Sequence, residues 1–542
     1  GFINALDKVA IWPDQHGMQP VTWGVAILTQ SSNIAINLTM QKRALPIAYM
    51  VTCGNMAQTS QAQLAMALLD DPRVSAIGLH IEGFGDLRAW EALAERAQAR
   101  GVPLVAMKVG ISDQARKATV SHTASLAGSD AGAQAFLDRL GISRLHGIPE
   151  FLETLKLLHC VGRLPSNRIA SISCSGGEAS LAADLATQRD LSFPVLNETQ
   201  EIELRDALGP MVALSNPLDY HTYIWRDEAA MGDAWTAMAT GDADLTLSIV
   251  DYPHTDAGDW GCATGAAIAA RSRSGRPFAV VSTLPELMPE DTARDLIAKQ
   301  VVPFAGLGEA LIAIEAAVQP DLQNKAPVLL PSEIDAAVTL SEHDAKRQLA
   351  GFGVNVPEAR QVDGPDGVNT AALGLRAPFA LKAVGMAHKS DSGGVRLGLT
   401  REEIGLAARE IGTDQLLLEE MVGDGVAELL IGVTCDDAHG FVLTLGAGGV
   451  LTEMLKDTVS LLIPSGDAQV EQALRRLNCA PLLFGYRGRP SADMATILST
   501  VQSVQAYVIA NAKTIAEVEI NPLICTPDRA VAVDALIRKA VK

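Results

Sequence analysis

Two apolar stretches near the end of the chain each carry a polar side chain suited to a metal-bound nucleotide. Asn521 lies in the run 518–523 and Asp534 in the run 531–535, with a short turn between the runs. If both runs are strands, the two side chains can face each other across a hairpin. Hard oxygen ligands on rigid strands are what Mg²⁺ bound to a nucleotide requires. The pattern therefore predicts that the chain consumes ATP; the alternative is an ordinary hairpin with a capping Asn and a surface Asp.

A lysine inside a third apolar run indicates the same chemistry. Lys382 lies in the segment Phe379–Ala383, which reads as a strand. Because a buried ammonium group is costly unless it is paired, we expect Lys382 to bind a phosphate. His388 follows in the polar loop 388–396, which contains two adjacent glycines. A solvated hairpin turn would explain the charges of this loop but not its pair of glycines.

Two more segments of the same region suit a nucleotide. Glu419 and Glu420 end the predicted strand 415–420, whose backbone groups could bind an adenine edge. Gly448 and Gly449 belong to a glycine loop that a carboxylate follows. A glycine loop lets backbone N–H groups approach a phosphate closely. We therefore expect these four residues to contact ATP.

A histidine in the first third of the chain lies among small hydroxyl residues. His122 belongs to the run 121–130, and the hydroxyls of Ser121, Thr123 and Ser125 can satisfy phosphate oxygens. A neutral imidazole nitrogen is a competent nucleophile toward phosphorus, and small neighbours leave room for the phosphoryl group. A lone histidine is more often a satisfied loop or core residue, so both interpretations of His122 stay open here.

A second glycine loop follows a predicted strand that begins at residue 168. Gly176 and Gly177 lie between that strand and a helix, where amide N–H groups can surround a phosphate. Glu178 could accept the second N–H of the imidazole and so favour one tautomer. Glu82, at the carboxyl end of another strand, is an equal candidate for this role, and a surface carboxylate is the alternative for each.

The elements that must position these residues fall into two classes. Four strands are expected at 21–28, 47–52, 76–81 and 103–108, with helices that include 61–70, 87–100 and 130–140. This alternation implies βαβ units around a parallel sheet, and a second series of the same type runs from 168 to about 318. Residues 319–335 carry three prolines and read as a linker. Paired strands follow, at 379–384, 395–399, 415–420, 427–434, 441–445, 516–520 and 530–534.

Composition sets the broad class. The chain has 542 residues, too many for one hydrophobic core, and 48% of them are apolar. The net charge of -20 argues against non-specific nucleic-acid binding, which needs a basic face. Seven cysteines without a Cys-x-x-Cys pair indicate reduced thiols in a cytoplasmic protein. No apolar run is long enough to cross a membrane, and no signal peptide is visible.

Several of these motifs together resemble the NDP-forming acyl-CoA synthetases, the relatives of succinyl-CoA synthetase and ADP-forming acetyl-CoA synthetase. The resemblance rests on Ser-His-Thr-x-x-x-Ala-Gly at 121–128, Leu-Lys at 381–382, His-Lys-Ser-Asp-x-Gly-Gly-Val at 388–395, Gly-x-Gly-Gly at 446–449, and Glu-Ile-Asn-Pro-Leu at 519–523 with Val-Asp at 533–534. It spans nearly the whole chain, and the motifs occur in the family's order.

The resemblance implies an α/β fold of several domains. Two flavodoxin-like, doubly wound parallel-sheet domains are expected at 1–155 and 156–318, the linker at 319–335 and an ATP-grasp domain at 336–542. In this family a Rossmann-like CoA-binding domain comes first. Residues 1–4 (Gly-Phe-Ile-Asn) look like the tail of that domain's closing motif, so we expect the CoA-binding domain itself to be missing from this chain.

The resemblance also implies roles for the site residues. His122 would be the phosphohistidine that takes the γ-phosphoryl group of ATP and passes it to a carboxylate, giving an acyl phosphate that the thiol of coenzyme A attacks. His388 stands where ADP-forming acetyl-CoA synthetases carry a second phosphorylatable histidine. Lys382 would hold nucleotide phosphates, and Asn521 and Asp534 would hold Mg²⁺. The match at Gly176, Gly177 and the nearby acid is looser.

We therefore expect an ATP-dependent acid–CoA ligase that forms ADP, acts on a small carboxylic acid and assembles as a homodimer. The alternative is a noncatalytic nucleotide- or CoA-sensing scaffold of the same fold. An ATP-grasp carboxylate–amine ligase is a weaker reading, because that class calls for neither the two flavodoxin-like domains nor the Ser-His-Thr loop. The sequence does not identify the acyl group of the substrate. Aromatic residues at 220–223, 252 and 260 could line a pocket for a bulky acid such as a hydroxycinnamate, or they are ordinary packing.

Overall fold

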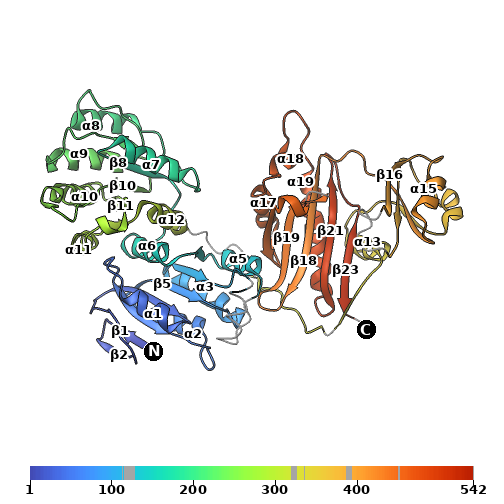
Figure 1. The fold of residues 1–542 in the computed structure, drawn as a ribbon, viewed down its shortest axis with the longest axis horizontal. Helices are drawn as coiled ribbons and strands as arrows, with labels where there is room; N and C mark the ends of the chain where they lie inside the picture. The colour runs from blue at the N-terminus through green and yellow to red at the C-terminus, as the bar shows by residue number, and fades with distance from the viewer. Residues whose placement is uncertain are drawn as a thin grey trace. The chain divides into compact units, whose positions relative to one another are not determined.

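The computed structural model of the chain forms two compact units, which Figure 1 shows as a ribbon. It describes residues 1–112, 114, 128–318, 326–334, 336–385, 393–449 and 452–540. Unit 1 contains residues 1–127 and 140–323, and unit 2 contains residues 128–139 and 324–542. The short stretch 128–139 therefore belongs to unit 2 although the chain on both sides of it belongs to unit 1.

The first sheet of unit 1 has the strand order β2-β1-β4-β3-β5-β6-β7. Its strands are β1 (Phe2–Asn4), β2 (Val9–Ile11), β3 (Gly24–Thr29), β4 (Ile47–Thr52), β5 (Val74–Ile81), β6 (Leu104–Lys108) and β7 (Ser143–Leu145). Five neighbouring strands, β4-β3-β5-β6-β7, are parallel, and their order is the one typical of flavodoxin. The expected all-parallel sheet is extended by an antiparallel pair, because β1 pairs with both β4 and β2.

Helices cover the faces of this sheet, and the strands read as apolar runs for that reason. The helices of this part are α1 (Ser32–Thr39), α2 (Gln61–Leu68), α3 (Leu87–Arg100) and α6 (Ile148–Cys160). Every residue of β3 is buried, as expected for a parallel strand covered on both faces. At Gly78 on β5, an added Cβ would lie 2.6 Å from the ring of Phe151, so glycine lets α6 pack directly on the sheet.

The second sheet of unit 1 repeats the same topology, with the order β12-β11-β10-β8-β9 and all pairs parallel. Its strands are β8 (Ile169–Ser173), β9 (Leu218–Asp219), β10 (Leu245–Ile249), β11 (Phe278–Ser282) and β12 (Val302–Ala305). Its helices are α7 (Gly176–Ala186), α8 (Glu198–Leu208), α9 (Glu228–Ala239), α10 (Gly261–Ser274), α11 (Glu290–Ala298) and α12 (Leu307–Ala317), with 3₁₀ turns η1 (Gly258–Trp260) and η2 (Pro285–Leu287). One apolar cluster, to which α6 and α12 both contribute, joins the two sheets.

Unit 2 contains two antiparallel sheets. The larger has the order β13-β23-β21-β18-β19-β20, with β22 paired to β21. Its strands are β13 (Ala337–Thr339), β18 (Ala427–Asp436), β19 (Gly440–Ala447), β20 (Thr458–Leu462), β21 (Ile515–Cys525), β22 (Ala530–Ala532) and β23 (Ala535–Ala540). The smaller sheet, β14-β17-β15-β16, consists of β14 (Ala359–Asp363), β15 (Phe379–Ala383), β16 (Val395–Leu399) and β17 (Gln415–Glu420).

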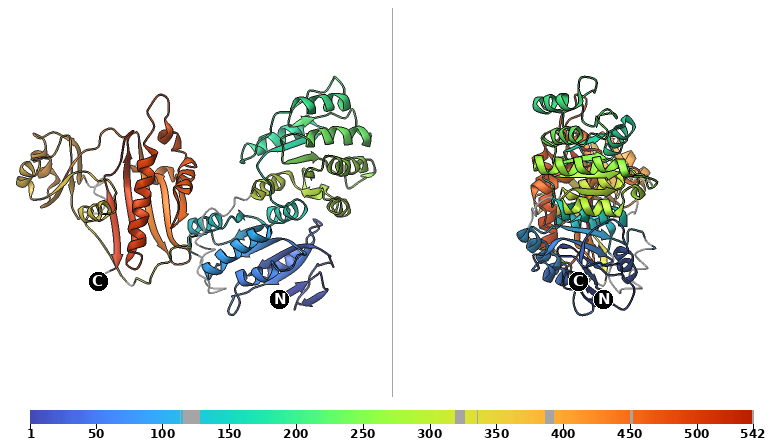
Figure 2. Two further views of the ribbon diagram at one scale, coloured as in Figure 1. Left: turned by 180° about the vertical axis from the view of Figure 1, so that it is seen from behind. Right: turned by 90° about the vertical axis from the view of Figure 1, so that its left-hand side faces the viewer.

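The helices of unit 2 divide between the two sheets. The long helix α19 lies against the larger sheet and shares its apolar core (Figure 2). The helices and 3₁₀ turn are α5 (Asp130–Arg139), α13 (Glu342–Ala350), η3 (Pro365–Gly367), α14 (Val368–Ala371), α15 (Ile404–Ile411), α16 (Thr452–Leu455), α17 (Asp467–Arg475), α18 (Ala480–Phe484) and α19 (Met494–Ala510). None of the helices in the described ranges has the length and apolar character needed to span a bilayer.

Candidate functional site

Lys382 on β15 lies at the centre of a buried group of four charged side chains, which we call the lysine–glutamate cluster: Glu342, Lys346, Lys382 and Glu419. The Lys382 Nζ lies 2.8 Å from Glu342 Oε1 and 2.9 Å from Glu419 Oε2. The Lys346 Nζ lies 2.7 Å from Glu342 Oε1 and 2.5 Å from Glu419 Oε1. All four side chains are at most 9% exposed. Two carboxylates therefore neutralise the charge of this lysine.

The cluster shifts the pKa values of its two lysines in opposite directions. Burial opposes the charged form of Lys382, but the attraction of Glu342 and Glu419, followed by that of Asp534, outweighs burial and raises the pKa of the lysine. Burial lowers the pKa of Lys346, and the charge of Lys382 adds to that effect. Lys382 is therefore a permanent cation, which suits it to a polyphosphate.

Lys382 also joins the smaller sheet to the larger one. Its Nζ donates a hydrogen bond of 2.6 Å to the carbonyl of Val533, the residue before Asp534. The two apolar runs near the chain end pair antiparallel, as predicted, with β21 against both β22 and β23. The backbone N–H of Asn521 donates to the carbonyl of Asp534 at 3.3 Å. The structure thus brings Lys382, Asn521 and Asp534 to one place.

The oxygens around this place suit a hard cation. Asn521 contributes an amide oxygen and Asp534 a carboxylate, and Glu519 lies close enough to Asp534 for their charges to interact. Burial, followed by the neighbouring Glu517, raises the pKa of Glu519. Across the described ranges no three His, Cys, Asp or Glu side chains gather as a metal site. A Mg²⁺ ion here would need ligands from the nucleotide phosphates, which is how proteins usually hold Mg²⁺ with ATP.

The glycine loop after β19 contacts Asn521. The backbone N–H of Gly449 donates to Asn521 Oδ1 at 2.8 Å. Gly448 packs against β18, where an added Cβ would lie 2.5 Å from the backbone carbon of Leu429. Gly449 adopts a φ of +72°, which favours glycine. Both glycines are therefore required for the loop to approach Asn521.

The two glutamates at the end of β17 have different surroundings. Glu419 is 1% exposed and belongs to the lysine–glutamate cluster. Glu420 points to Arg376, whose Nη2 lies 3.1 Å from Glu420 Oε2. Sequence reasoning assigned both residues to adenine through their backbone and missed the side-chain role of Glu419. It also missed Glu342 and Lys346, whose only sequence signal is a pair of opposite charges four residues apart on α13.

A separate group of carboxylates lies in the second sheet of unit 1. Glu178 is in the first turn of α7, Asp219 ends β9 and Asp251 follows β10. These positions lie at the carboxyl ends of the strands, where the strand order reverses between β8 and β10. Ligands of doubly wound sheets bind at such points.

The surroundings of Glu178 disfavour its charged form. Burial, followed by the charges of Asp251 and Asp219, raises the pKa of Glu178 to about 7. Among the described residues no partner hydrogen-bonds its buried Oε2. Asp251, in contrast, accepts hydrogen bonds from the N–H and the hydroxyl of Thr283, both at 2.7 Å. Glu178 therefore has an acceptor oxygen available for a further donor.

The glycines beside Glu178 form the start of α7. Gly176 and Gly177 are exposed, and the side chain of the N-cap residue Ser175 makes no capping hydrogen bond to the first turn. An added Cβ at Gly176 would lie 3.1 Å from Asp219 Oδ2. Uncapped N–H groups at a helix start can hold a phosphate.

The other carboxylate candidate, Glu82, follows β5 in the first sheet. The Gln30 side chain, which sequence reasoning did not single out, accepts hydrogen bonds from the backbone N–H groups of Glu82 and Gly83. The Lys108 Nζ donates to the Glu82 carbonyl at 2.9 Å. These contacts use the Glu82 backbone and leave its side chain out, so they give no reason to prefer Glu82 over Glu178.

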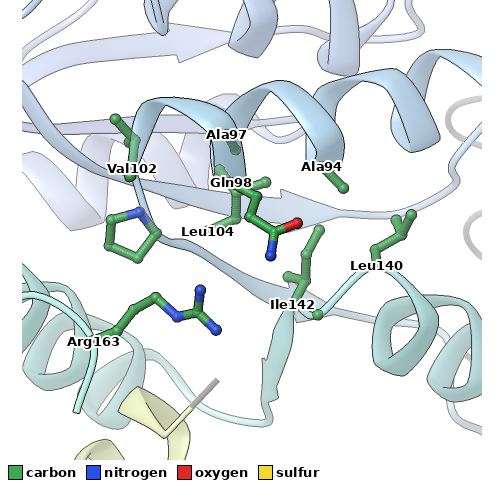
Figure 3. Close-up of a pocket in the computed structure, with 11 residues that line it drawn as sticks. Ala94, Ala97, Gln98, Val102, Leu104, Leu140, Ile142 and Arg163 are labelled. Atoms are coloured by element: carbon green, nitrogen blue, oxygen red, sulfur yellow. The ribbon is translucent and has the colours of Figure 1, made fainter. Parts of the chain in front are cut away.

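Two predicted site residues, His122 and His388, lie outside the described residues. A small hollow in unit 1 lies beside the amino-terminal end of β6, whereas Glu82 follows the carboxyl end of the parallel strand β5 (Figure 3). The amide of Gln98 and the guanidinium of Arg163 point into it between apolar side chains. None of the predicted site residues lines this hollow.

The chain is similar to two protein-family models. Residues 335–538 match an ATP-grasp domain, and residues 23–158 match a succinyl-CoA ligase-like flavodoxin domain. These matches agree with the predicted α/β fold of flavodoxin-like and ATP-grasp domains.

Curated relatives and solved structures agree with those matches. The chain is 27% identical over 577 residues to a trans-feruloyl-CoA synthase from an unidentified prokaryote, which covers 99% of this chain and 80% of the relative. It is 30% identical over 212 residues to the beta subunit of an ADP-forming acetate–CoA ligase from Pyrococcus furiosus, covering 36% of this chain and 89% of that subunit. An acetyl-coenzyme A synthetase from Ca. Korarchaeum cryptofilum, solved with phosphate and ADP, has a similar fold, with a TM-score of 0.50 and 20% identity over 58% of this chain and 68% of its own.

Proposed function

Because the chain belongs to the ADP-forming acyl-CoA synthetases and is an acid–CoA ligase, we propose that it works through phosphorylation of His122. In this proposal ATP, a carboxylic acid and coenzyme A give an acyl-CoA, ADP and phosphate. Residues of unit 2 bind the nucleotide and Mg²⁺, and Glu178 accepts a hydrogen bond from the imidazole ring of the phosphohistidine.

One observation carries the nucleotide part of the proposal. The cationic Lys382 hydrogen-bonds the residue next to Asp534, and Asp534 in turn accepts from the backbone of Asn521. A phosphate-binding cation thus lies beside a carboxylate and an amide oxygen. The donor set fits Mg²⁺ with a polyphosphate, since hard oxygens and one cation are what that group requires.

In the first half-reaction, an imidazole nitrogen of His122 attacks the γ-phosphorus. The bond to the bridging oxygen breaks, and ADP leaves with the electron pair. Lys382 neutralises charge that develops on the phosphate oxygens, while Asn521 and Asp534 would hold Mg²⁺, which supplies further positive charge. The Gly449 N–H donates to Asn521 Oδ1 and the Gly448 N–H donates to the Glu428 carbonyl, so this loop holds Asn521 in place.

In the second half-reaction, Glu178 accepts an N–H of the phosphorylated ring and orients it. Gly176 and Gly177 offer backbone N–H groups to the phosphoryl oxygens. The substrate carboxylate attacks the phosphorus and the bond to the imidazole nitrogen breaks, which gives an acyl phosphate. The thiol of coenzyme A, as thiolate, then attacks the acyl carbon, and phosphate leaves.

Chromatography of the products tests the reaction class. With ATP, Mg²⁺, coenzyme A and a suitable acid, ADP and phosphate should form in equal amounts with acyl-CoA. AMP and pyrophosphate would reject the proposal, because attack on a γ-phosphorus cannot give them. Binding of ATP without its consumption would favour the noncatalytic nucleotide-sensing alternative.

We also propose that the acid is aromatic or otherwise bulky, following the trans-feruloyl-CoA synthase among the relatives. Tyr220 and Tyr252 are buried in the core and serve packing. Trp225 and Trp260 are only partly buried, with ring centroids 5.6 Å apart, and Tyr223 is exposed. A thermal-shift screen with ATP and coenzyme A should rank hydroxycinnamates above acetate; the reverse order would reject this choice.

Two finer expectations complete the proposal. We expect a homodimer, which light scattering would test. We also expect a reducing, cytoplasmic compartment, since all seven cysteines are free thiols in the structure. Fractionation of the native source would test the compartment.

A further inference from the structure

Helix α5 begins eight residues after His122 and belongs to unit 2. The strand that precedes the His122 segment, β6, belongs to unit 1, and so does β7, which follows α5. The segment that carries His122 therefore leaves from one unit and ends on the other.

The first turn of α5 is held by the turn between β18 and β19. The backbone N–H of Ser129 donates to Asp436 Oδ2 at 2.7 Å. The other oxygen of this carboxylate lies 3.1 Å from His439 Nδ1. Burial opposes the charge on Asp436, but its hydrogen bonds with His439 and Ser129 outweigh burial and hold the pKa of the carboxyl well below its usual range. The carboxylate is thus ionised, and a negative charge stabilises a helix N-terminus.

Two glycines let His439 approach α5 closely. An added Cβ at Gly128 would lie 2.3 Å from His439 Cε1, and one at Gly132 would lie 2.8 Å from His439 Nδ1. His439 itself is fully buried. Gly128 also has a φ of +61°, which a larger residue rarely adopts. The ring of His439 therefore occupies space that any other residue at these two positions would fill.

The last residue of α5 is held as well. The Arg139 guanidinium donates to the carbonyl of Leu462 at 3.1 Å and to that of Pro464 at 2.7 Å. It also donates to the carbonyl of Ala326 at 2.5 Å. Arg139 is only 8% exposed. Both ends of this ten-residue helix are thus attached to unit 2 by charged groups.

We propose that Asp436, His439 and Arg139 form an anchor that fixes the end of the His122 segment to the ATP-grasp unit. This inference rests on the proposed function, since it makes Asp436 and His439 positioning residues for phosphoryl transfer from ATP. Because Ser129 is fixed on the unit that binds the nucleotide, only a short stretch of chain joins His122 to that unit, which raises the effective concentration of the imidazole at the γ-phosphate. A misplaced reacting group costs rate even when the ligand still binds.

The test compares Asp436→Asn and His439→Ala with Asp437→Asn, which removes the same charge from an exposed position of the same turn. Hydrogen exchange at residues 129–139 reads the anchor directly, and exchange in β21 shows that the unit stays folded. Rapid-quench labelling with γ-labelled ATP reads the phosphorylation rate, and calorimetry reads ATP affinity. We expect faster exchange in α5 and phosphorylation slowed on the order of 10- to 100-fold in the first two variants, at unchanged ATP affinity. Asp437→Asn should match the wild type.

Normal exchange protection of α5 in Asp436→Asn and His439→Ala would overturn the anchor. Lost protection with a normal phosphorylation rate would overturn the positioning role. Failure of the proposed function looks different: the wild type itself takes up no label, the positioning role falls with it, and hydrogen exchange still decides whether the anchor exists.

Discussion

Lys382 shows how a buried cation can be kept ready for a phosphate. Its Nζ has hydrogen-bond partners in Glu342, Glu419 and the carbonyl of Val533. An ammonium group has three donors, so a phosphate must displace one of these acceptors. The neutral carbonyl of Val533 is the weakest of them and lies beside Asp534. We therefore expect a nucleotide to enter between Lys382 and the larger sheet.

Replacing Lys382 or Lys346 by Met separates binding from stability. Each variant leaves two buried carboxylates with one ammonium group, so each should cost about 3–5 kcal/mol of unfolding free energy. Only Lys382→Met should also abolish phosphorylation by ATP, because only Lys382 borders Asp534 and Val533. Urea unfolding and labelling with γ-labelled ATP measure the two effects. Equal loss of labelling in both variants would mean that the cluster acts only as a structural unit.

The carboxylates near α7 give a pH prediction. Glu178 must be ionised to accept an imidazole N–H, and its pKa is raised to about 7, first by burial and then by Asp251. Transfer of the phosphoryl group from His122 to the acid should therefore fall as the pH drops through about 7. Asp251→Asn removes a negative neighbour, lowers the pKa of Glu178 and should move this acidic limb to lower pH. A single-turnover pH profile measures the shift; an unmoved or upward-shifted limb would exclude Glu178 as the titrating group.

At the scale of elements, the glycine loop after β19 depends on close backbone packing. Gly448→Ala places a Cβ 2.5 Å from the backbone carbon of Leu429, which cannot move without bending β18. The displaced loop would withdraw the Gly449 N–H from Asn521. Because Asn521 would lose this contact, we expect ATP affinity to fall on the order of tenfold, which corresponds to about one hydrogen bond.

Gly432→Ala is the matched control for this change. Gly432 lies on β18, the strand against which Gly448 packs, and an added Cβ at Gly432 would lie 3.9 Å from Thr444, an ordinary van der Waals distance. Calorimetric titration with ATP should separate the two variants. Equal affinities would show that the contact of the loop with Asn521 does not affect ATP binding.

The sequence allowed many elements to be predicted and few of their contacts. The bounds of β4, β16 and α3 agree with the expected 47–52, 395–399 and 87–100, because apolar runs and helical periodicity are local signals. The strand expected at 530–534 is β22, which ends at Ala532, and a separate strand, β23, begins at Ala535. The backbone bonds of Val533 and of Asp534 to the Asn521–Pro522 step interrupt the pairing there.

The candidate site divides in the same way. The pairing of the runs that carry Asn521 and Asp534 is a hairpin property, and the hairpin prediction is confirmed. The burial of Lys382 could be predicted from its apolar strand. Its partners Glu342 and Glu419 could not, because they come from other elements, α13 and β17. The contact of Ser129 with Asp436 joins residues 307 positions apart. Such contacts depend on tertiary packing, which leaves no local pattern.

At the scale of the whole molecule, the chain passes between the two units three times, at 127/128, 139/140 and 323/324. The residues proposed to bind the nucleotide belong to unit 2, and the carboxylates around Glu178 belong to unit 1. The proposed relay therefore requires His122 to reach residues of both units in turn. The expected linker 319–335 contains one of the three crossings.

The central claim is that His122 carries the phosphoryl group. Brief incubation of the chain with γ-labelled ATP and Mg²⁺, followed by separation from free nucleotide, measures it directly. We expect an acid-labile, base-stable label that persists in His388→Ala if only one histidine is phosphorylated, and that disappears in His122→Ala. A label of wild-type size in the double variant His122→Ala/His388→Ala would exclude a phosphohistidine at either position.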